Sequence, residues 1–359
     1  GDGGDGGGGG GGARGARALG ADTTLLVICH DRADYLERTL GAVLRYHPGE
    51  DTVPIIISQD GNDAKVVGVV DAFRAQFAAK HPRVRFHHIH RPQEGNLRGG
   101  GRQDGYQKLA QHFGWAFRRL WEDPALTPGA ARVIVLEEDL EVAPDFFELF
   151  GALAPLLDTD PTLLAASAWN DNGQRGHVAE PAALLRSDFF PGLGWMATAA
   201  VLRDELLPKW PKGYWDDWLR EPAQRRGRHT LRPEICRTFH FGIKGTSNMQ
   251  YGDYLTQIKL NDEFVEFGAL DLGYLGAERW AREYPAAARA AREVRAEEVK
   301  RNQISKGPVR VKFNGIQDFA RKAKMLGIMD NEKAGVPRTA YKNIVEFWHN
   351  GIKVYVSDI

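Results

Sequence analysis

The residues best suited to chemistry are acidic and lie at the end of an apolar run. In VIVLEEDLEVAPDFF (residues 133–147), four apolar residues lead directly into Glu137, Glu138 and Asp139. Adjacent carboxylates repel one another unless a positive group lies between them. A divalent cation with oxygen ligands is one such group, and it can neutralise the charge on a leaving phosphate. A solvated surface cluster is the alternative, so these three residues alone leave a metal site open.

A second acidic pair lies among aromatic residues in KGYWDDWLREP (residues 212–222), where Trp215 and Trp218 flank Asp216 and Asp217. Tryptophan stacks well on the apolar faces of sugar rings. A carboxylate among such rings loses solvation, which raises its pKa and makes it a better general base. Acidic residues are also favourable at the positive end of a helix dipole. The sequence does not choose between a catalytic base and a simple helix start.

Glycine-rich stretches could form pocket walls or ordinary loops. The clearest are PGLGWM (residues 191–196, which contains Leu193), WNDNG (169–173) and GIKGTSNMQYG (242–252). The last has about the length of a mobile active-site loop.

Apolar, β-branched runs and helical spacings alternate through the first half of the chain. Strands are expected at residues 23–29, 53–61, 84–89, 133–136 and 163–170. Between them, apolar residues recur at helical spacing within residues 36–44, 66–77 and 109–120. Near-continuous apolar strands that alternate with helices predict an α/β domain with a mainly parallel sheet.

Three of the expected strands end in polar residues, which suggests a ligand site. In such sheets, ligands bind beyond the carboxyl ends of the strands. His30-Asp31-Arg32, Ser58-Gln59-Asp60 and Glu137-Glu138-Asp139 all occupy such ends, which favours the metal interpretation. No GxxxxGK[ST] phosphate loop is present. A nucleotide-sugar site, from which a nucleoside diphosphate leaves as an anion, is the interpretation that remains.

The sequence changes character near residue 282, where we expect a second module to begin. Residues 286–300 are rich in Ala, Arg and Glu and predict one exposed helix, and residues 309–313 alternate like a half-buried strand. Asn350-Gly351 between two strand-like runs predicts a hairpin. We therefore predict three parts: a flexible linker at 1–22, the α/β domain at 23–282, and a small α+β domain at 283–359.

Composition narrows the possible partners. Lys and Arg (47) balance Asp and Glu (47) among 359 residues, which gives no reason to expect a nucleic acid or an anionic membrane surface. The two cysteines, Cys29 and Cys236, fit no zinc pattern and are expected to be buried free thiols. No apolar run approaches the ~20 residues that span a bilayer. Ten of the first twelve residues are glycine, which is typical of a flexible tether, so we expect a soluble part of a longer protein.

Long blocks of the sequence resemble one enzyme family. They are VIVLEEDLEVAPDFFELF, SAWNDNGQ, RSDFFPGLGWM, PKWPKGYWDDWLREPAQRRGR, LRPEICRTFHFGIKG, IKLNDEFVEF and VRVKFNGIQDFARKAKMLGIMDNEKAGVPRTAYKNIV. In order and spacing they are similar to the N-acetylglucosaminyltransferase I family (glycosyltransferase family 13). The resemblance implies a GT-A fold, a UDP-GlcNAc donor and Mn²⁺. It further implies inverting transfer of GlcNAc, in β-1,2 linkage, to the terminal α-1,3-linked mannose of Man5GlcNAc2 N-glycans.

The resemblance also assigns roles to individual residues. Asp139 matches the metal ligand, and Asp216 the catalytic base that inversion requires. Glu137 and Glu138 match residues near the donor sugar and ribose, although the family usually has Asp where this chain has Glu138. Trp215 and Leu193 would line the donor and acceptor pocket.

The remaining assignments concern the nucleotide. Arg32, Asp60 and His112 match its pocket, with Asp60 at the uracil edge, while Thr246 and Ser247 match a loop that covers the donor. Animal members pair the cysteine before the Arg32 position with one that follows the Asp60 position. This chain has Gly61 there, so that bridge cannot form.

The resemblance leaves alternatives. It implies a type II Golgi membrane protein with a lumenal catalytic domain, and we expect the anchor to be absent from this chain. A sister group that acts on protein O-linked mannose also carries EED, and HFGI (residues 240–243) leans toward it. YWDDWLREP and the C-terminal module favour the N-glycan acceptor. A non-catalytic sugar-binding module is a third possibility, but it would need neither Asp139 nor Asp216.

Overall fold

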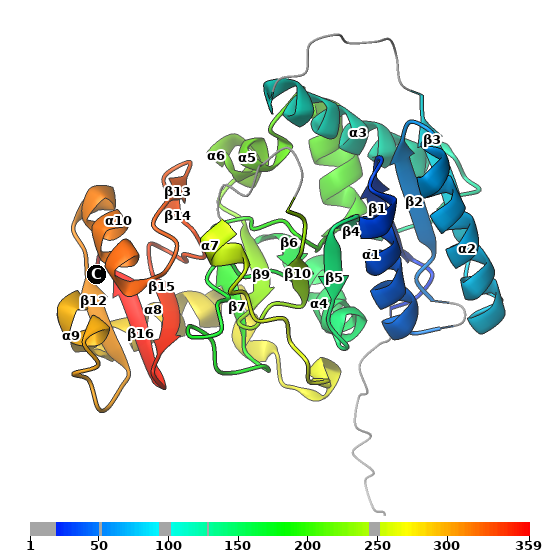
Figure 1. Cartoon of the computed structure of the whole chain (residues 1–359). Coiled ribbons are helices and arrows are strands. Elements are labelled where there is room, and N and C mark those ends of the chain that lie inside the picture. Colours follow the sequence, from blue (N-terminus) through cyan, green and yellow to red (C-terminus); the bar gives the residue numbers. More distant parts are fainter. Residues whose placement is uncertain (1–18, 50–51, 93–101, 128, 244–251) are drawn as a thin grey trace, which may run out of the picture.

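The computed structural model describes residues 19–49, 52–92, 102–127, 129–243 and 252–359. Thr246 and Ser247 therefore lie outside the described residues, as do most of the predicted 242–252 loop and of the predicted linker. Within the described part, Figure 1 shows a central sheet flanked by helices, with a smaller sheet in the C-terminal region.

The central sheet has eight strands in the order β3-β2-β1-β4-β8-β6-β9-β7. Its bounds are β1 (Thr23–Cys29), β2 (Ile55–Asp60), β3 (Phe86–Arg91), β4 (Arg132–Glu137), β6 (Leu163–Ser167), β7 (Leu184–Ser187), β8 (Trp195–Thr198) and β9 (His229–Pro233). The first four strands in that order run parallel, as do β6 and β9. β8 is antiparallel to β4 and β6, and β7 is antiparallel to β9. The predicted α/β fold with a largely parallel central sheet is confirmed.

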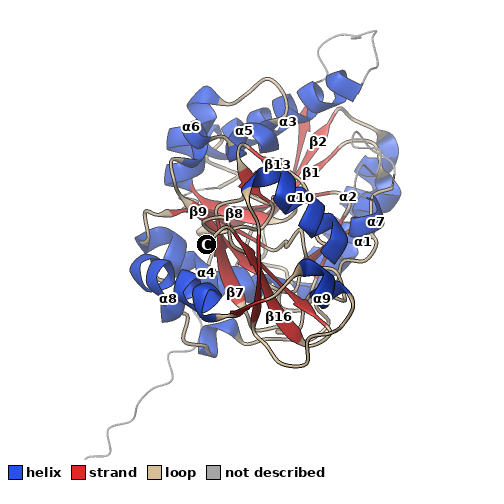
Figure 2. Cartoon of the chain, turned by 90° about the vertical axis from the view of Figure 1, so that its left-hand side faces the viewer, coloured by secondary structure: helices blue, strands red, loops and turns tan. Residues whose placement is uncertain are grey.

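Helices cover both faces of this sheet, which explains why the interiors of β1 and β4 are apolar on both faces. Leu25 and Val27 face one hydrophobic core, while Leu26 and Ile28 face the other. The first core includes α1 (Ala33–Tyr46), α2 (Ala64–Lys80) and α4 (Phe146–Thr159). The second includes α3 (Arg102–Glu122), η1 (Ala200–Leu206), η2 (Leu207–Lys209) and α5 (Trp215–Arg220). Figure 2 shows α3 and α5 on the opposite side of the strands from α4.

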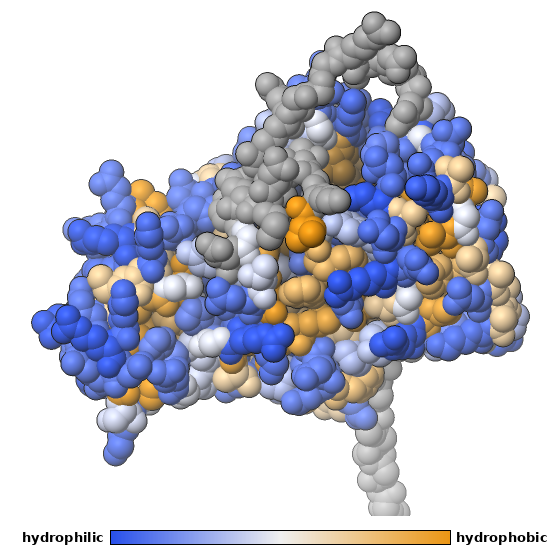
Figure 3. Space-filling view, viewed as in Figure 1, coloured by the Kyte–Doolittle hydropathy of each residue, from blue (hydrophilic) through white to orange (hydrophobic). Residues whose placement is uncertain are grey.

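Several smaller elements lie outside the central sheet. β5 (Leu140–Val142) pairs antiparallel with β10 (Thr238–His240). The other short elements are α6 (Pro222–Arg225), α7 (Gly252–Leu255), η3 (Phe267–Ala269) and η4 (Gly273–Leu275). In the space-filling view of Figure 3, apolar surface gathers in the middle of the face shown, and polar residues dominate the C-terminal region at the left.

The C-terminal region has its own sheet, in the order β11-β12-β16-β15. Its elements are β11 (Arg292–Glu293), α9 (Ala296–Lys300), β12 (Val309–Lys312), α10 (Gly315–Leu326), β15 (Val345–His349) and β16 (Ile352–Ser357), with a small hairpin of β13 (Glu332–Lys333) and β14 (Val336–Pro337). The predicted hairpin at Asn350-Gly351 is confirmed, because β15 and β16 pair antiparallel around it. Asn350 and Gly351 have φ of 47° and 75°, as a type I′ turn requires.

The prediction of one exposed helix over 286–300 is wrong. Helix α8 (Ala277–Ala290) ends before β11, and α9 follows as a separate helix. Ala291 leaves the helix in an extended conformation, and β11 then pairs with β12. Helical propensity is thus overridden here by tertiary packing. The predicted boundary at 282 falls inside α8, so the proposed division into domains stays a prediction.

Two predictions from composition can be compared with the structure. Cys29 and Cys236 are buried free thiols, as expected. Burial raises the pKa of both thiols, that of Cys236 to about 12. Among the described residues, no helix is long and apolar enough to cross a membrane.

Candidate active site

The carboxyl ends of β1 and β4 bring Arg32 together with the acidic cluster, by which we mean Glu137, Glu138 and Asp139. Arg32 Nε lies 2.6 Å from Glu138 Oε1, and its Nη1 lies 2.9 Å from Asp139 Oδ2. The positive group that these neighbouring carboxylates need is therefore supplied by the adjacent strand end. Arg32 was predicted as a nucleotide contact, and its position at this edge brings it into the same site.

Glu138 ties the acidic cluster to the turn between β1 and α1. Its side chain is buried and accepts a hydrogen bond from the His30 backbone N at 2.9 Å. Its carbonyl accepts a second from Thr39 Oγ1 at 2.7 Å. Burial raises the pKa of Glu138, and the charge of Arg32 opposes that rise. These contacts give Glu138 a role in holding the β1–α1 turn, which sequence reasoning did not foresee.

Asp139 is held by the ribbon of β5 and β10. Phe241 N donates to Asp139 O at 3.1 Å, and His240 Nε2 lies 3.5 Å from Asp139 Oδ2. Burial would raise the pKa of Asp139, but the hydrogen bond and charge of His240, together with Arg32, hold it below its ordinary value. The backbone of Gly242 comes so close that a Cβ there would lie 2.4 Å from Asp139 Oδ2.

Glu137 is the last residue of β4 and the first residue of the acidic cluster. Burial raises its pKa to about 8, with the charge of Asp139 as the next contribution. The charge of Asp216 raises it further. The cluster and the acidic pair on α5 are therefore close enough to interact electrostatically.

Asp216 and Asp217 both lie in the first turn of α5, so the helix-start interpretation holds. Arg220 Nη1 lies 2.8 Å from Asp216 Oδ2 and 2.8 Å from Asp217 Oδ1. The Asp216 side chain is 38% exposed, whereas that of Arg220 is 7% exposed. A buried arginine thus holds a carboxylate that remains open to a second molecule.

Trp215 differs from the expectation that its ring faces a sugar. The residue is 5% exposed, and its ring stacks on Phe113 at 4.6 Å and on Trp195 at 5.8 Å between centroids. This aromatic packing belongs to the second hydrophobic core. Trp215 therefore anchors the start of α5 beneath Asp216.

Asp60 and His112 lie at and beside the end of β2. Asp60 accepts two hydrogen bonds from Arg91 Nη1, at 3.0 and 3.2 Å. His112 Nε2 lies 2.9 Å from Ser58 Oγ. Burial, and then the charge of Arg91, lowers the pKa of His112 to about 3, so its imidazole is neutral. Their contact with a nucleotide stays a prediction.

Leu193 lies in a left-handed stretch that borders the same edge. It has φ of 50°, and the glycines on either side, Gly192 and Gly194, have φ of 72° and 89°. Thr238 Oγ1 donates to Leu193 O at 2.6 Å. A Cβ on Gly194 would lie 2.6 Å from Thr238 Cγ2, so glycine is required by both conformation and space. The loop is thereby fixed against β10, two residues from His240.

The metal prediction has a chemically suitable donor pair in Asp139 and His240. Among the described residues, no group of three or more His, Cys, Asp or Glu could hold a metal ion by itself. Carboxylate oxygen and imidazole nitrogen are both suitable ligands for first-row divalent metals. The protein side of such a site would thus be sparse, with other ligands from a bound diphosphate or water. Sequence reasoning missed His240, because His240 lies beside Asp139 only through the pairing of β5 with β10.

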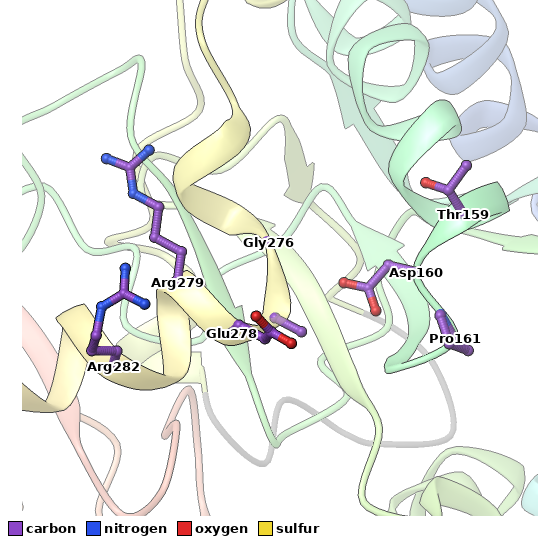
Figure 4. Close-up of a pocket in the computed structure, with 8 residues that line it drawn as sticks. Thr159, Asp160, Pro161, Gly276, Glu278, Arg279 and Arg282 are labelled. Carbon is purple, nitrogen blue, oxygen red and sulfur yellow. The ribbon is translucent and has the colours of Figure 1, made fainter.

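A separate hollow of about 420 Å³ lies at the opposite end of β6. Figure 4 shows it between the end of α4, with Thr159, Asp160 and Pro161, and the start of α8, with Gly276 and Glu278. Thr159, Asp160 and Pro161 directly precede β6, which runs in the same direction as β4 because both are antiparallel to β8. The hollow is therefore at the amino edge of the sheet, away from the acidic cluster.

The whole chain can now be compared with known proteins. It belongs to the GNT-I family, which matches residues 16–358, and the family recognised from the sequence is confirmed. It is 43% identical over 326 residues to the alpha-1,3-mannosyl-glycoprotein 2-beta-N-acetylglucosaminyltransferase of Arabidopsis thaliana, with 90% of this chain and 70% of that protein covered.

Two solved structures are distantly similar. The mannosyltransferase PcManGT from Pyrobaculum calidifontis, in complex with GDP-Man and Mn²⁺, has a TM-score of 0.39 and 14% identity over 62% of this chain and 59% of its own. TarS 1–349 from S. aureus has a TM-score of 0.40 and 10% identity over 85% of this chain and 81% of its own.

Proposed function

We propose that this chain transfers GlcNAc from UDP-GlcNAc, with inversion and in β-1,2 linkage, to the terminal α-1,3-linked mannose of Man5GlcNAc2 N-glycans. The observation that carries the proposal is the position of Asp216. In a member of the GNT-I family, this carboxylate is 38% exposed and is held at 2.8 Å by the nearly buried Arg220. Inversion by a single in-line displacement needs such an accessible base on the acceptor hydroxyl, opposite the leaving UDP.

On the donor side, Asp139 would hold a divalent metal, which we propose to be Mn²⁺, with His240 beside it. The metal would supply positive charge to the diphosphate as UDP leaves. Arg32 already compensates Asp139 and Glu138, so the cluster is arranged to tolerate concentrated negative charge. Glu137, Asp60 and His112 are proposed to line the remainder of the donor site, with Thr246, Ser247 and Leu193 at its border.

On the acceptor side, Asp216 would accept the proton of the attacking mannose hydroxyl. Arg220 holds one of its oxygens at 2.8 Å, which fixes the direction of the carboxylate. Trp215 fixes the helix below it through its stacking on Phe113. The protein therefore orients the base before the acceptor arrives, which is the main requirement for efficient proton transfer.

The place of action proposed is the Golgi lumen. The proposal follows from the N-glycan acceptor, because the trimmed oligosaccharide is a substrate of that compartment.

The decisive experiment incubates the chain with UDP-GlcNAc and Mn²⁺, using Man5GlcNAc2 and an O-mannosyl peptide as parallel acceptors. Transfer to Man5GlcNAc2 is expected. Transfer to the O-mannosyl peptide alone would replace the proposed acceptor, and donor binding with no transfer to either would indicate a sugar-binding module.

The variant Asp216→Asn tests the base. We expect transfer to fall by about 10²–10⁴-fold, with UDP-GlcNAc binding by calorimetry unchanged. Asp204→Asn is the control, since Asp204 is an exposed partner of Arg203 elsewhere on the surface. Activity of Asp216→Asn near that of the control would show that Asp216 is not the base.

A further inference from the structure

The C-terminal region reaches the acidic pair on α5 through one side chain. Lys333, in the β13–β14 hairpin, places its Nζ 2.9 Å from Asp217 Oδ2. The two residues are 116 positions apart in the sequence. Figures 1 and 2 show β13 beside the α5–α6 region.

Asp217 and Asp216 share one guanidinium nitrogen. Arg220 Nη1 lies 2.8 Å from an oxygen of each. The rest of the guanidinium is fixed, because Nε donates to Phe190 O at 2.9 Å and the group lies over the Phe189 ring at 4.8 Å. If the Arg220 guanidinium moves toward one carboxylate, its hydrogen bond to the other carboxylate is weakened.

Lys333 gives Asp217 a second cationic partner beside Arg220. Two carboxylates on α5 face two cations, Arg220 and Lys333, so charge is matched only when both are present. Opposite charges at this distance attract appreciably even near the surface. With Lys333 in place, Asp217 has a second partner, and Arg220 can keep its bond to Asp216.

The hairpin that carries Lys333 is fixed on both sides. Before it, Met329 N donates to Asn172 Oδ1 at 2.8 Å. After it, Arg338 Nη1 lies 2.6 Å from Asp171 Oδ1, and both of these side chains are almost fully buried. The loop at Asp171 and Asn172 belongs to the central domain. The position of Lys333 is thus fixed by contacts between the C-terminal region and the loop at Asp171 and Asn172.

We propose that Lys333 is a positioning residue for the reaction, acting through Asp217 and Arg220 to hold Asp216 in its productive orientation. This inference rests on the proposed function of Asp216 as the base. It gives the C-terminal region a part in the chemistry, although none of its residues need touch the donor.

A purely structural role predicts a different outcome. The side chains of Lys333 and Asp217 are 36% and 37% exposed, and ion pairs with this exposure contribute little to folding. Loss of Lys333 should therefore leave the protein folded. The expected consequence is that Asp216 is misplaced, which lowers kcat.

The test compares Lys333→Met, Lys333→Arg and Lys322→Met by kcat, KM and calorimetric binding of UDP-GlcNAc. Lys322 is a matched control, because its Nζ lies 2.8 Å from Asp318 Oδ2 within the C-terminal region. For Lys333→Met we expect kcat to fall by about 10–100-fold, as small misplacements of reacting groups do, with the donor Kd and Tm unchanged. Lys333→Arg should recover most of the activity, and Lys322→Met should match wild type.

A double variant tests whether Lys333 acts on Asp216 through Asp217 and Arg220. Asp217→Asn removes the charge that competes for Arg220, so Lys333→Met combined with Asp217→Asn should be more active than Lys333→Met alone. Such coupling is the signature of residues that act through one another.

Three outcomes overturn the inference. Wild-type kcat in Lys333→Met, while Asp216→Asn is inactive, refutes the positioning role alone. A fall in Tm that parallels the loss of activity, without rescue by Lys333→Arg, assigns Lys333 a structural role. Full activity of Asp216→Asn would refute the proposed base and, with it, this inference.

Discussion

The acidic cluster after β4 and the acidic pair on α5 are both carboxylate sites, yet they are stabilised differently. The side chains of Glu138 and Asp139 are 4% and 9% exposed, and their partners all come from strand ends of the central domain. Asp216 and Asp217 are 38% and 37% exposed, and one of their two cations comes from the C-terminal hairpin.

The difference follows from what each site is proposed to do. A site that binds a metal and a diphosphate benefits from rigid, desolvated charges, because electrostatic interactions are strong where water is excluded. A base must instead meet an incoming hydroxyl, so it has to remain accessible. Its orientation then depends on neighbours, and here those neighbours come from two parts of the chain.

The largest expected effect on stability comes from removing the cation of the acidic cluster. Arg32→Met leaves Glu138 and Asp139 without their shared partner in a buried position, which should cost about 3 kcal/mol of unfolding free energy. Urea denaturation measures this. Arg38→Met is the control, since Arg38 pairs with Glu141 at a far more exposed position and should lose less than about 1 kcal/mol. Equal losses of unfolding free energy in the two variants would show that the buried ion pairs of the acidic cluster stabilise the protein no more than an exposed ion pair does.

A smaller effect is expected from crowding Asp139. In Gly242→Ala the new Cβ would lie 2.4 Å from Asp139 Oδ2, so the carboxylate or the backbone must shift. Overpacking of this kind costs about 1–3 kcal/mol, and Mn²⁺-dependent donor binding should weaken with it. Gly68→Ala, in α2, meets no atom within 4 Å and should be neutral or stabilising. Unchanged Mn²⁺ dependence in Gly242→Ala would argue against Asp139 as the metal ligand.

The same comparison explains how far sequence reasoning could go. Three features were predictable because each depends on local sequence. They are the apolar run of β1, the turn residues of the Asn350-Gly351 hairpin, and the absence of a metal-binding spacing around the two free cysteines. Asp139 and Asp216 were assigned through a resemblance, and their roles stay predictions. His240 and Lys333 were missed, because each meets its partner only through a pairing of distant segments.

One failure has the same origin. Residues 286–300 have the composition of a helix, and local propensity correctly marks the end of α8 and the whole of α9. The break at β11 depends on its pairing with β12, which no local pattern reveals. The unforeseen contact of Glu138 with the His30 backbone is likewise a product of neighbouring strand ends.

The smallest expected effect concerns the ion pair of Lys333 and Asp217. Burial would raise the pKa of Asp217, but the hydrogen bonds and charges of Lys333 and Arg220 hold it below its ordinary value of 3.8. A carboxyl whose folded pKa is depressed stabilises the protein above its unfolded pKa, and this stabilisation is lost as pH falls through the folded pKa. Because the pair is more than one-third exposed, screening should limit its contribution to less than about 1 kcal/mol at pH 7.

Asp217→Asn makes that contribution measurable. The stability difference between wild type and Asp217→Asn should shrink in 1 M salt, where the screening length is about 3 Å, and should shrink again as pH falls below 3.8. The loss in Arg32→Met should respond much less to salt, because Glu138 and Asp139 are buried. If the two losses instead responded equally to salt, the acidic cluster would be as solvated as the pair on α5, and the contrast between a rigid binding site and an adjustable base would not hold.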